Sequence, residues 1–189
     1  MAVGGDSDVS SENDTQGLGD GQLRVDPGTQ VLVSTASMQQ PLSVLPSAPT
    51  GNVLLVSSTA PAAVERRLRE RGIEVGTVGL LPITGSTVDY DGPLWTSEPV
   101  VPDDLTGLSM RFTSALDALE AGQGWILCDA LDELAMYSRQ DRICRCFDHL
   151  TTTARDHELK GVYTVAGEAL EAETYNNFTA SVDRILDSR

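Results

Sequence analysis

The sequence GWILCD at residues 124–129 is an apolar run that ends in a carboxylate. Continuous apolar runs of this length are typical of parallel strands that are covered on both faces. In open α/β sheets, ligands bind beyond the carboxyl ends of such strands, which makes Asp129 a candidate site residue. The alternative is a structural role, in which Asp129 caps the helical segment expected at residues 131–137.

Further runs of both kinds lie on either side of this stretch. Strands are expected at residues 30–34, 52–57, 75–81, 161–165 and 184–186. Amphipathic helices are expected at residues 61–71, around the apolar positions 105–119, and at residues 140–157 and 174–182. Alternation of strands and helices implies a parallel sheet with right-handed crossovers. We therefore expect an α/β fold with a mostly parallel central sheet.

Residues 82–103 are rich in Pro, Gly, Thr and Asp, which predicts a long loop between a strand and a helix. Thr59 is the expected cap of the preceding helix, and Asp103 that of the following one. Tyr90 and Trp95 lie in this loop, and aromatic residues in an aromatic-poor chain are candidates for a contact surface. The alternative for Trp95 is that it covers the edge of the sheet.

The first 22 residues contain five acidic and no basic side chains. We expect residues 1–22 to form a disordered acidic tail and residues 23–189 to form a single domain. The first 20 residues lack the apolar core of a secretory signal, and the three cysteines are odd in number. Both features favour a reduced cytoplasmic location.

The chain carries 28 acidic and 13 basic residues, a net charge of −15. Phosphate groups would be repelled, so we expect no direct nucleic-acid binding and no anionic-membrane binding. No apolar run is long enough to span a membrane. Lys160 is the one lysine beside 12 arginines, which favours a protein that stays soluble in a salt-loving cytoplasm. The alternative is codon bias in a GC-rich genome.

A nucleotide phosphate site requires glycines that allow close backbone approach and a lysine that reaches the phosphates. Residues 34–41, which follow the first expected strand, read STASMQQP and contain neither. No GxxxxGK or GxGxxG motif occurs elsewhere in the chain. We therefore expect no ATP hydrolysis and no bound cofactor.

Residues 30–187 resemble the RecA/KaiC-type ATPase core, in the degenerate form of KaiC-like or HTR-like proteins of salt-loving archaea. The segments that carry this resemblance are YDG at 90–92, PDDLTGL at 102–108, the stretch 124–137 and GVY at 161–163. The resemblance implies a RecA-like three-layer sandwich. It places the Walker B position at Asp129, with Asp132 beside it, whereas residues 34–41 depart from the Walker A pattern.

This resemblance implies a non-catalytic regulatory or protein-interaction module, with signal transduction as one setting. Self-association or docking onto an active relative would use the surface around Tyr90 and Trp95. The alternative is a nucleotide-binding sensor or ATPase, in which Asp129 and Asp132 bind nucleotide and a partner subunit supplies the missing cation. A DNA-associated regulator is a third class, and the net charge opposes it.

Three weaker patterns carry less weight. Cys144 and Cys146 lie two residues apart on an expected helix and cannot both face one ion, so we expect no metal site. The arginines at positions 66, 67, 69 and 71 alternate with glutamates and predict a solvated helix face, with an acidic partner as the alternative. No GxSxG motif is present, so nothing supports hydrolase chemistry.

Overall fold

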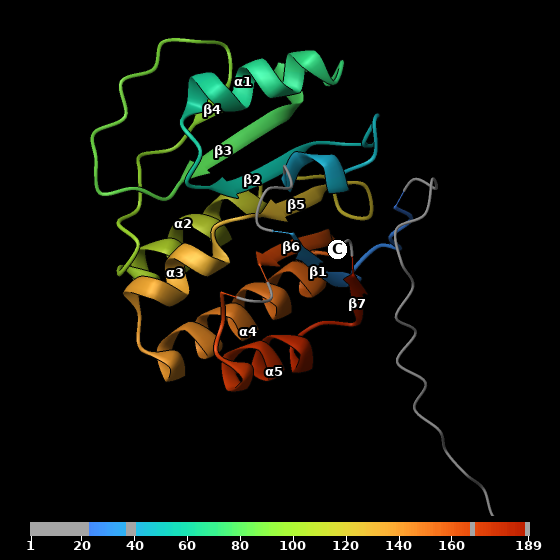
Figure 1. Cartoon of the computed structure of the whole chain (residues 1–189). Coiled ribbons are helices and arrows are strands. Elements are labelled where there is room, and N and C mark those ends of the chain that lie inside the picture. The colour runs from blue at the N-terminus through green and yellow to red at the C-terminus, as the bar shows by residue number, and fades with distance from the viewer. Residues whose placement is uncertain (1–22, 37–40, 167–168, 188–189) are drawn as a thin grey trace, which may run out of the picture.

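The computed structural model describes residues 23–36, 41–166 and 169–187. Within these residues, seven parallel strands form one sheet in the order β4-β3-β2-β5-β6-β1-β7 (Figure 1). The strands are β1 (Gln30–Thr35), β2 (Val53–Ser57), β3 (Val78–Pro82), β4 (Trp95–Thr96), β5 (Trp125–Cys128), β6 (Lys160–Ala166) and β7 (Arg184–Asp187). The helices are α1 (Pro61–Glu70), α2 (Leu105–Leu116), α3 (Leu131–Tyr137), α4 (Gln140–Asp156) and α5 (Ala172–Ala180). Two short 3-10 helices are η1 (Pro41–Val44) and η2 (Val75–Thr77).

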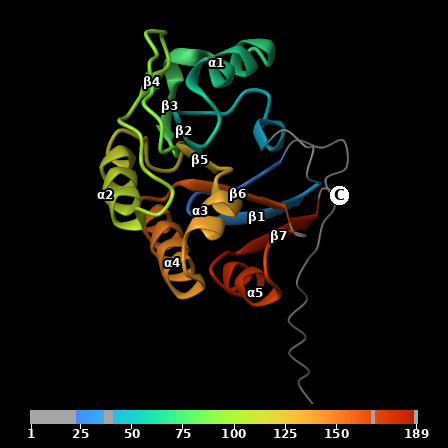
Figure 2. The same cartoon turned by 60° about the vertical axis from the view of Figure 1, so that its left-hand side comes forward.

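Helices cover both faces of the sheet (Figure 2). On one face, α2, α3, α4 and α5 enclose a core that includes Leu32, Ile126 and Phe147. On the other face, α1 and η1 cover a second core that includes Val33 and Leu127. The central strands are buried along their whole length, which is why the middle residues of β1 and β2 and all of β5 are apolar. The expected α/β fold, a three-layer sandwich around a parallel sheet, is confirmed.

Parallel pairing brings the carboxyl ends of all strands to one edge of the sheet. Ser57 ends β2, and Asp129 directly follows β5, which pairs with β2. Strand β6 separates β5 from β1 and ends at Ala166 on the same edge. This edge is therefore where the candidate site must be sought.

Four local predictions at element boundaries are wrong. The first residue of α1 is Pro61, so its N-cap is Ala60 and not Thr59, and no side chain caps it. In α2 the cap is Asp104 rather than Asp103, because only Asp104 lies three residues before Gly107, whose N–H it accepts at 2.8 Å. The strand expected at residues 75–81 begins with η2, and the expected loop contains the short strand β4.

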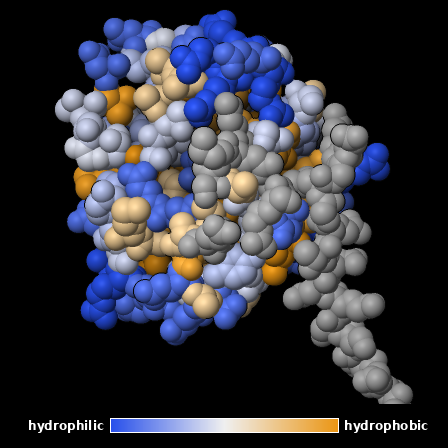
Figure 3. All heavy atoms as spheres, in the orientation of Figure 1, coloured by the Kyte–Doolittle hydropathy of each residue, from blue (hydrophilic) through white to orange (hydrophobic). Residues whose placement is uncertain are grey.

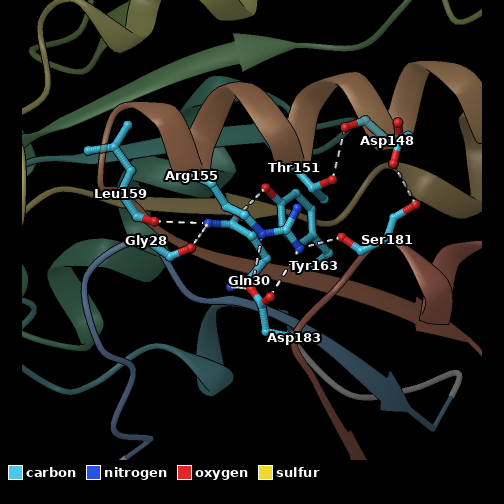
Figure 4. Close-up of polar contacts among 9 residues, drawn as sticks. All are labelled: Gly28, Gln30, Asp148, Thr151, Arg155, Leu159, Tyr163, Ser181 and Asp183. Atoms are coloured by element: carbon cyan, nitrogen blue, oxygen red, sulfur yellow. Dashed lines mark hydrogen bonds and ion pairs between the residues drawn. The ribbon is translucent and has the colours of Figure 1, made fainter.

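At the end of the sheet where the strands begin, a partly buried polar network joins β1 to β6, to α4 and to Asp183, which precedes β7 (Figure 4). The fully buried Gln30 donates from Nε2 to the carbonyl oxygen of Leu159 at 2.9 Å. The hydroxyl of Tyr163 donates to Gln30 Oε1 at 2.8 Å. Arg155 on α4 bonds Asp183, whose carboxylate also accepts the backbone N–H of Gln30 at 2.7 Å. These contacts satisfy the polar groups that the first strand would otherwise bury unpaired.

None of the helices in the described ranges is both long and apolar enough to cross a membrane.

Candidate functional site

The carboxyl ends of β2 and β5 place Ser57 beside Asp129. The backbone N–H of Asp129 donates to the carbonyl oxygen of Val56 at 3.0 Å and extends the pairing of the two strands. The Ser57 hydroxyl donates a hydrogen bond to the Asp129 carboxylate and also accepts the N–H of Thr59 at 3.1 Å. Asp129 is thus held across the sheet, toward the start of α1.

The Asp129 carboxylate is enclosed from above by η1 and α1. Pro41 and Leu42 from η1 and Arg67 from α1 line the space next to Asp129 and Ser57. This space has a volume of about 10 Å³. It is the size of roughly one water molecule, whereas pockets for cofactors and other small molecules reach several hundred cubic ångströms. This space, as the described residues bound it, is therefore too small for a nucleotide.

Burial raises the pKa of Asp129 to about 6. The hydrogen bond from Ser57 and the positive charge of Arg67 act in the opposite direction, while the charge of Glu133 adds to the rise. Asp129 Oδ1 is buried and has no hydrogen-bond partner among the described residues. An ionised carboxylate in this position is only partly compensated.

Asp132 lies on the first turn of α3 and points to the neighbouring strand end. Its Oδ2 accepts the backbone N–H of Ala166 at 2.9 Å, which ties α3 to the end of β6. Burial raises the pKa of Asp132, and the hydrogen bond from Ala166 lowers it. Like Asp129, it has a second oxygen, Oδ1, that is buried without a partner among the described atoms.

The hypothesis that Asp129 caps the following helix is wrong. The N-cap of α3 is Ala130, and no side chain forms a cap hydrogen bond there. Asp129 lies one residue too early, and its carboxylate is bonded to Ser57 on the adjacent strand instead. The backbone N–H of Asp129, which donates to the Val56 carbonyl oxygen, joins β2 and β5 at their carboxyl ends.

The two aromatic candidates lie away from this carboxylate and on opposite faces of the sheet. The Tyr90 hydroxyl donates to Glu65 Oε2 at 2.7 Å and accepts the N–H of Leu94 at 3.1 Å, so it fastens the long loop to α1. Trp95 lies in the edge strand β4, with 58% of its surface exposed, on the side of α2. The structure thus gives Tyr90 an internal contact and leaves Trp95 accessible.

Ser57 and Arg67 were not among the predicted site residues. The arginines of α1 do not form one face: Arg69 pairs with Glu65 at 2.8 Å on the exposed side, where Figure 3 shows a hydrophilic surface. Arg67 and Arg71 instead share the inward stripe of Val64 and Leu68, at spacings of three and four residues. That periodicity is the signal in the sequence that could have identified them.

The first residues of the stretch at the Walker A position, which departs from the Walker A pattern, are bonded within the fold. The Ser34 and Tyr175 hydroxyls are 3.1 Å apart, and Thr35 Oγ1 donates to the carbonyl oxygen of Val165 at 3.4 Å. Residues 37–40 of this stretch, like the expected tail 1–22, lie outside the described residues.

The cysteines do not converge on an ion. Cys146 is a buried residue of α4, and Cys144 on the same helix is partly exposed. Within the part of the chain that the structure describes, no three His, Cys, Asp or Glu side chains are placed to hold a metal ion.

Two solved structures from the archaeon Pyrococcus horikoshii OT3 share this fold. A KaiC-like protein from Pyrococcus horikoshii OT3 superposes with a TM-score of 0.59 at 12% identity, covering 85% of this chain and 73% of that one. Another P. horikoshii OT3 protein, known from a structural study, superposes with a TM-score of 0.62 at 14% identity, covering 89% and 84%. The fold is therefore the RecA fold of KaiC-like proteins.

Comparisons of sequence give less detail. No curated protein matches the chain. A family model described as a family of unknown function (DUF7504) matches residues 21–187.

Proposed function

The chain belongs to the DUF7504 family of unknown function, and we propose that it is a non-catalytic regulatory or protein-interaction module with a degenerate phosphate site. The observation that supports this most directly is the enclosure of Asp129. Pro41 and Leu42 lie against the space beside the carboxylate, and its volume of about 10 Å³ takes no phosphate group.

The absence of glycine and lysine from residues 34–41 and the distant position of Lys160 support the same proposal. Residues 34–41 contain no glycine and no lysine, so neither a backbone cradle nor a phosphate-binding ammonium group is supplied. Lys160 begins β6, at the opposite edge of the sheet, and lies over the Trp125 ring at 5.1 Å. A strand of this length places it roughly 20 Å from the carboxyl edge. The residues present therefore do not fit a magnesium–nucleotide complex.

The cellular setting of this module is proposed from composition. The net charge of −15 and the single lysine suit a salt-loving cytoplasm, and they disfavour nucleic-acid and membrane partners. We place one domain at residues 23–189 behind the acidic segment 1–22, with a protein partner or a second copy as the ligand. Signal transduction is the setting that such a module fits.

Calorimetric titration with magnesium-ATP in multimolar salt tests the proposal. We expect no saturable heat and no phosphate release above background, for the wild type and for Asp129→Asn alike. Turnover in a clean preparation that disappears in Asp129→Asn would contradict the proposal, because only a working site depends on that carboxylate.

A second candidate is a nucleotide-binding sensor that a partner subunit completes. The observation that favours it is that Asp129 Oδ1 and Asp132 Oδ1 are both buried without a hydrogen-bond partner in the described ranges. A ligand that binds the folded state raises the melting temperature by mass action. Magnesium-nucleotide should then raise the melting temperature of the wild type by several degrees and leave Asp129→Asn unchanged, at constant ionic strength.

A further inference from the structure

On one face of the sheet, the layer of helices leaves the strands at one side uncovered. On the face that α2, α4 and α5 cover, the described helices extend from β7 to β2, and none lies over β4 and the first residues of β3 (Figure 2). A groove of about 860 Å³ occupies this position, between the β3–β4 edge and the outer side of α2. The second core continues on the opposite face beneath α1, so the uncovered region lies on one face alone.

The groove is lined by apolar groups that remain accessible. Leu54, Gly79 and Trp95 from the sheet and Met110 and Ala115 from α2 are among the residues that line it. Trp95 is 58% exposed and Met110 is 67% exposed. Aromatic residues and methionine are enriched in the centres of protein interfaces, where methionine adapts to the partner's shape.

The dimensions of the groove match a helix better than a small molecule or a strand. A helix with its side chains is about 10 Å across, so the groove would take in roughly two turns of one. Small-molecule pockets bury most of their ligand, and here the exposed Trp95 and Met110 leave the groove open. An added strand would have to pair with β4, which has only two residues, Trp95 and Thr96.

The charges around the groove select the kind of helix. Glu98 and Arg111 line the groove and form an ion pair at 3.3 Å, which leaves that pair neutral. Glu74 and Glu120 are exposed and lie within two residues of lining residues in the sequence, and the lining offers them no free basic side chain, whereas Asp117 pairs with His157 at 3.8 Å. A second copy would bring another 15 excess negative charges, whereas a basic helix would be attracted.

We propose that this groove is the docking site for an amphipathic helix of a partner protein, with basic side chains beside the apolar face of that helix. The inference rests on the proposed function as an interaction module and names the class of partner. The partner's apolar side chains would pack on Trp95 and Met110, and its basic side chains would face Glu74 and Glu120.

A synthetic peptide tests this without knowledge of the natural partner. The probe is a helical peptide with leucine at positions i, i+3, i+4 and i+7 and arginine on the flanks. It is titrated into the full chain in the lowest salt that keeps the chain folded. The Trp125→Phe background leaves Trp95 as the one indole. We expect saturable binding, a blue shift of Trp95 emission, and backbone amide shifts confined to α2, β3 and β4.

Variants and peptide controls separate the groove from general charge attraction. Met110→Glu on α2 and Ala118→Trp, which fills the groove, should each weaken binding at least tenfold. Met136→Glu is the matched control, because Met136 is exposed on α3 outside the groove, and it should bind as the wild type does. A scrambled peptide of equal composition and an acidic version should bind much more weakly.

Several outcomes would overturn the inference: equal binding of the scrambled peptide, unchanged binding by Met110→Glu, or a concentration-dependent dimer that Met110→Glu dissociates. Magnesium-nucleotide is titrated into the same chain in a separate experiment, and the backbone amide shifts are measured again. Amide shifts at Ser57 and Asp129 would overturn the proposed function and leave the groove standing. An absence of both peptide binding and nucleotide shifts would overturn the groove alone.

Discussion

The indole of Trp95 lies against Gly79 on the neighbouring strand, where a Cβ atom on residue 79 would come within 3.0 Å of the indole Cε3. The strand register pairs these two residues directly, so their side chains would share one face of the sheet. The glycine leaves the space that the ring occupies, and Trp95 is held in place while more than half of its surface faces solvent. Trp95 is therefore already positioned at the groove in the chain without a partner.

Gly79→Ala should displace the Trp95 ring without unfolding the chain. The new methyl group meets the ring at a distance that forces it aside by a few tenths of an ångström. Alanine also lowers the conformational entropy of the unfolded chain, and this stabilises the folded state and offsets the unfavourable contact. We therefore expect a change of less than about 1 kcal/mol in the free energy of unfolding. In the Trp125→Phe background, Trp95 emission should shift. Gly85→Ala, where nothing lies within 4 Å, is the control, and identical spectra for both variants would contradict the prediction.

Tyr163→Phe should destabilise the fold by about 1–3 kcal/mol, because it leaves a buried acceptor unpaired. The hydroxyl of Tyr163 is the donor to Gln30 Oε1, and both residues are completely buried. Urea unfolding at constant high salt measures the effect. Tyr137→Phe removes a hydroxyl from a residue that is 59% exposed and should change nothing. Equal stability of the two variants would mean that the hydrogen bond between Tyr163 and Gln30 contributes little to the free energy of unfolding.

Asp104→Ala should cost about 1 kcal/mol by removing the cap of α2. The adjacent Asp103→Ala removes one negative charge as well, but it leaves the hydrogen bond from the Gly107 N–H to Asp104 in place. It should therefore destabilise the fold much less than Asp104→Ala does. Thermal unfolding of the two variants under the same conditions provides the comparison. If the two melting temperatures fall together, charge rather than capping determines the effect.

Most of the fold could be predicted because its signals are local. The apolar runs at residues 53–57 and 125–128 are buried on both faces, and burial of that kind leaves a continuous pattern in the sequence. Strand β4 could not be predicted, since its two residues are defined by pairing with Gly79 and Leu80 rather than by any pattern of their own. The cap of α2 was misplaced by one residue because two aspartates are adjacent.

The candidate site could be predicted only in part. Asp129 follows from its place after an apolar strand, and the structure puts it at the carboxyl edge as that place requires. Its contact with Ser57 and the charge of Arg67 depend on which strands are neighbours and on how α1 packs. Sequence order does not reveal this, because β2 and β5 are separated by more than sixty residues.

Low ionic strength should destabilise the fold. The net charge of −15 is screened over roughly 3 Å at 1 M salt but over roughly 10 Å at 0.1 M, so repulsion within the compact state grows as salt is removed. Circular dichroism should show a lower melting temperature in dilute buffer than in multimolar potassium chloride. Sucrose is the control for general exclusion effects. A cooperative transition at the same temperature across the salt range would contradict the expectation.

The pKa of Asp129 makes the stability of this protein depend on pH in a defined direction. Burial raises it from 3.8 to about 6, so the folded state holds a proton that the unfolded chain has already released. The stability contributed by the neutral carboxyl is fully present below about pH 4 and is lost as the pH rises toward about 6. At neutral pH the folded protein therefore carries the cost of an ionised, partly compensated carboxylate.

Asp129→Asn removes that cost, because an amide of the same shape can still bond the Ser57 hydroxyl. We expect the variant to be more stable than the wild type at neutral pH by about 1–3 kcal/mol, and the difference to vanish near pH 4. Urea unfolding of both proteins across this range, in constant high salt, measures it. Ser57→Ala is the companion variant: it removes a hydrogen bond that lowers the Asp129 pKa, so it should widen the pH-dependent loss. A wild type that exceeds Asp129→Asn in stability at neutral pH would show that the ionised carboxylate is satisfied, and a bound cation would then be the first group to look for.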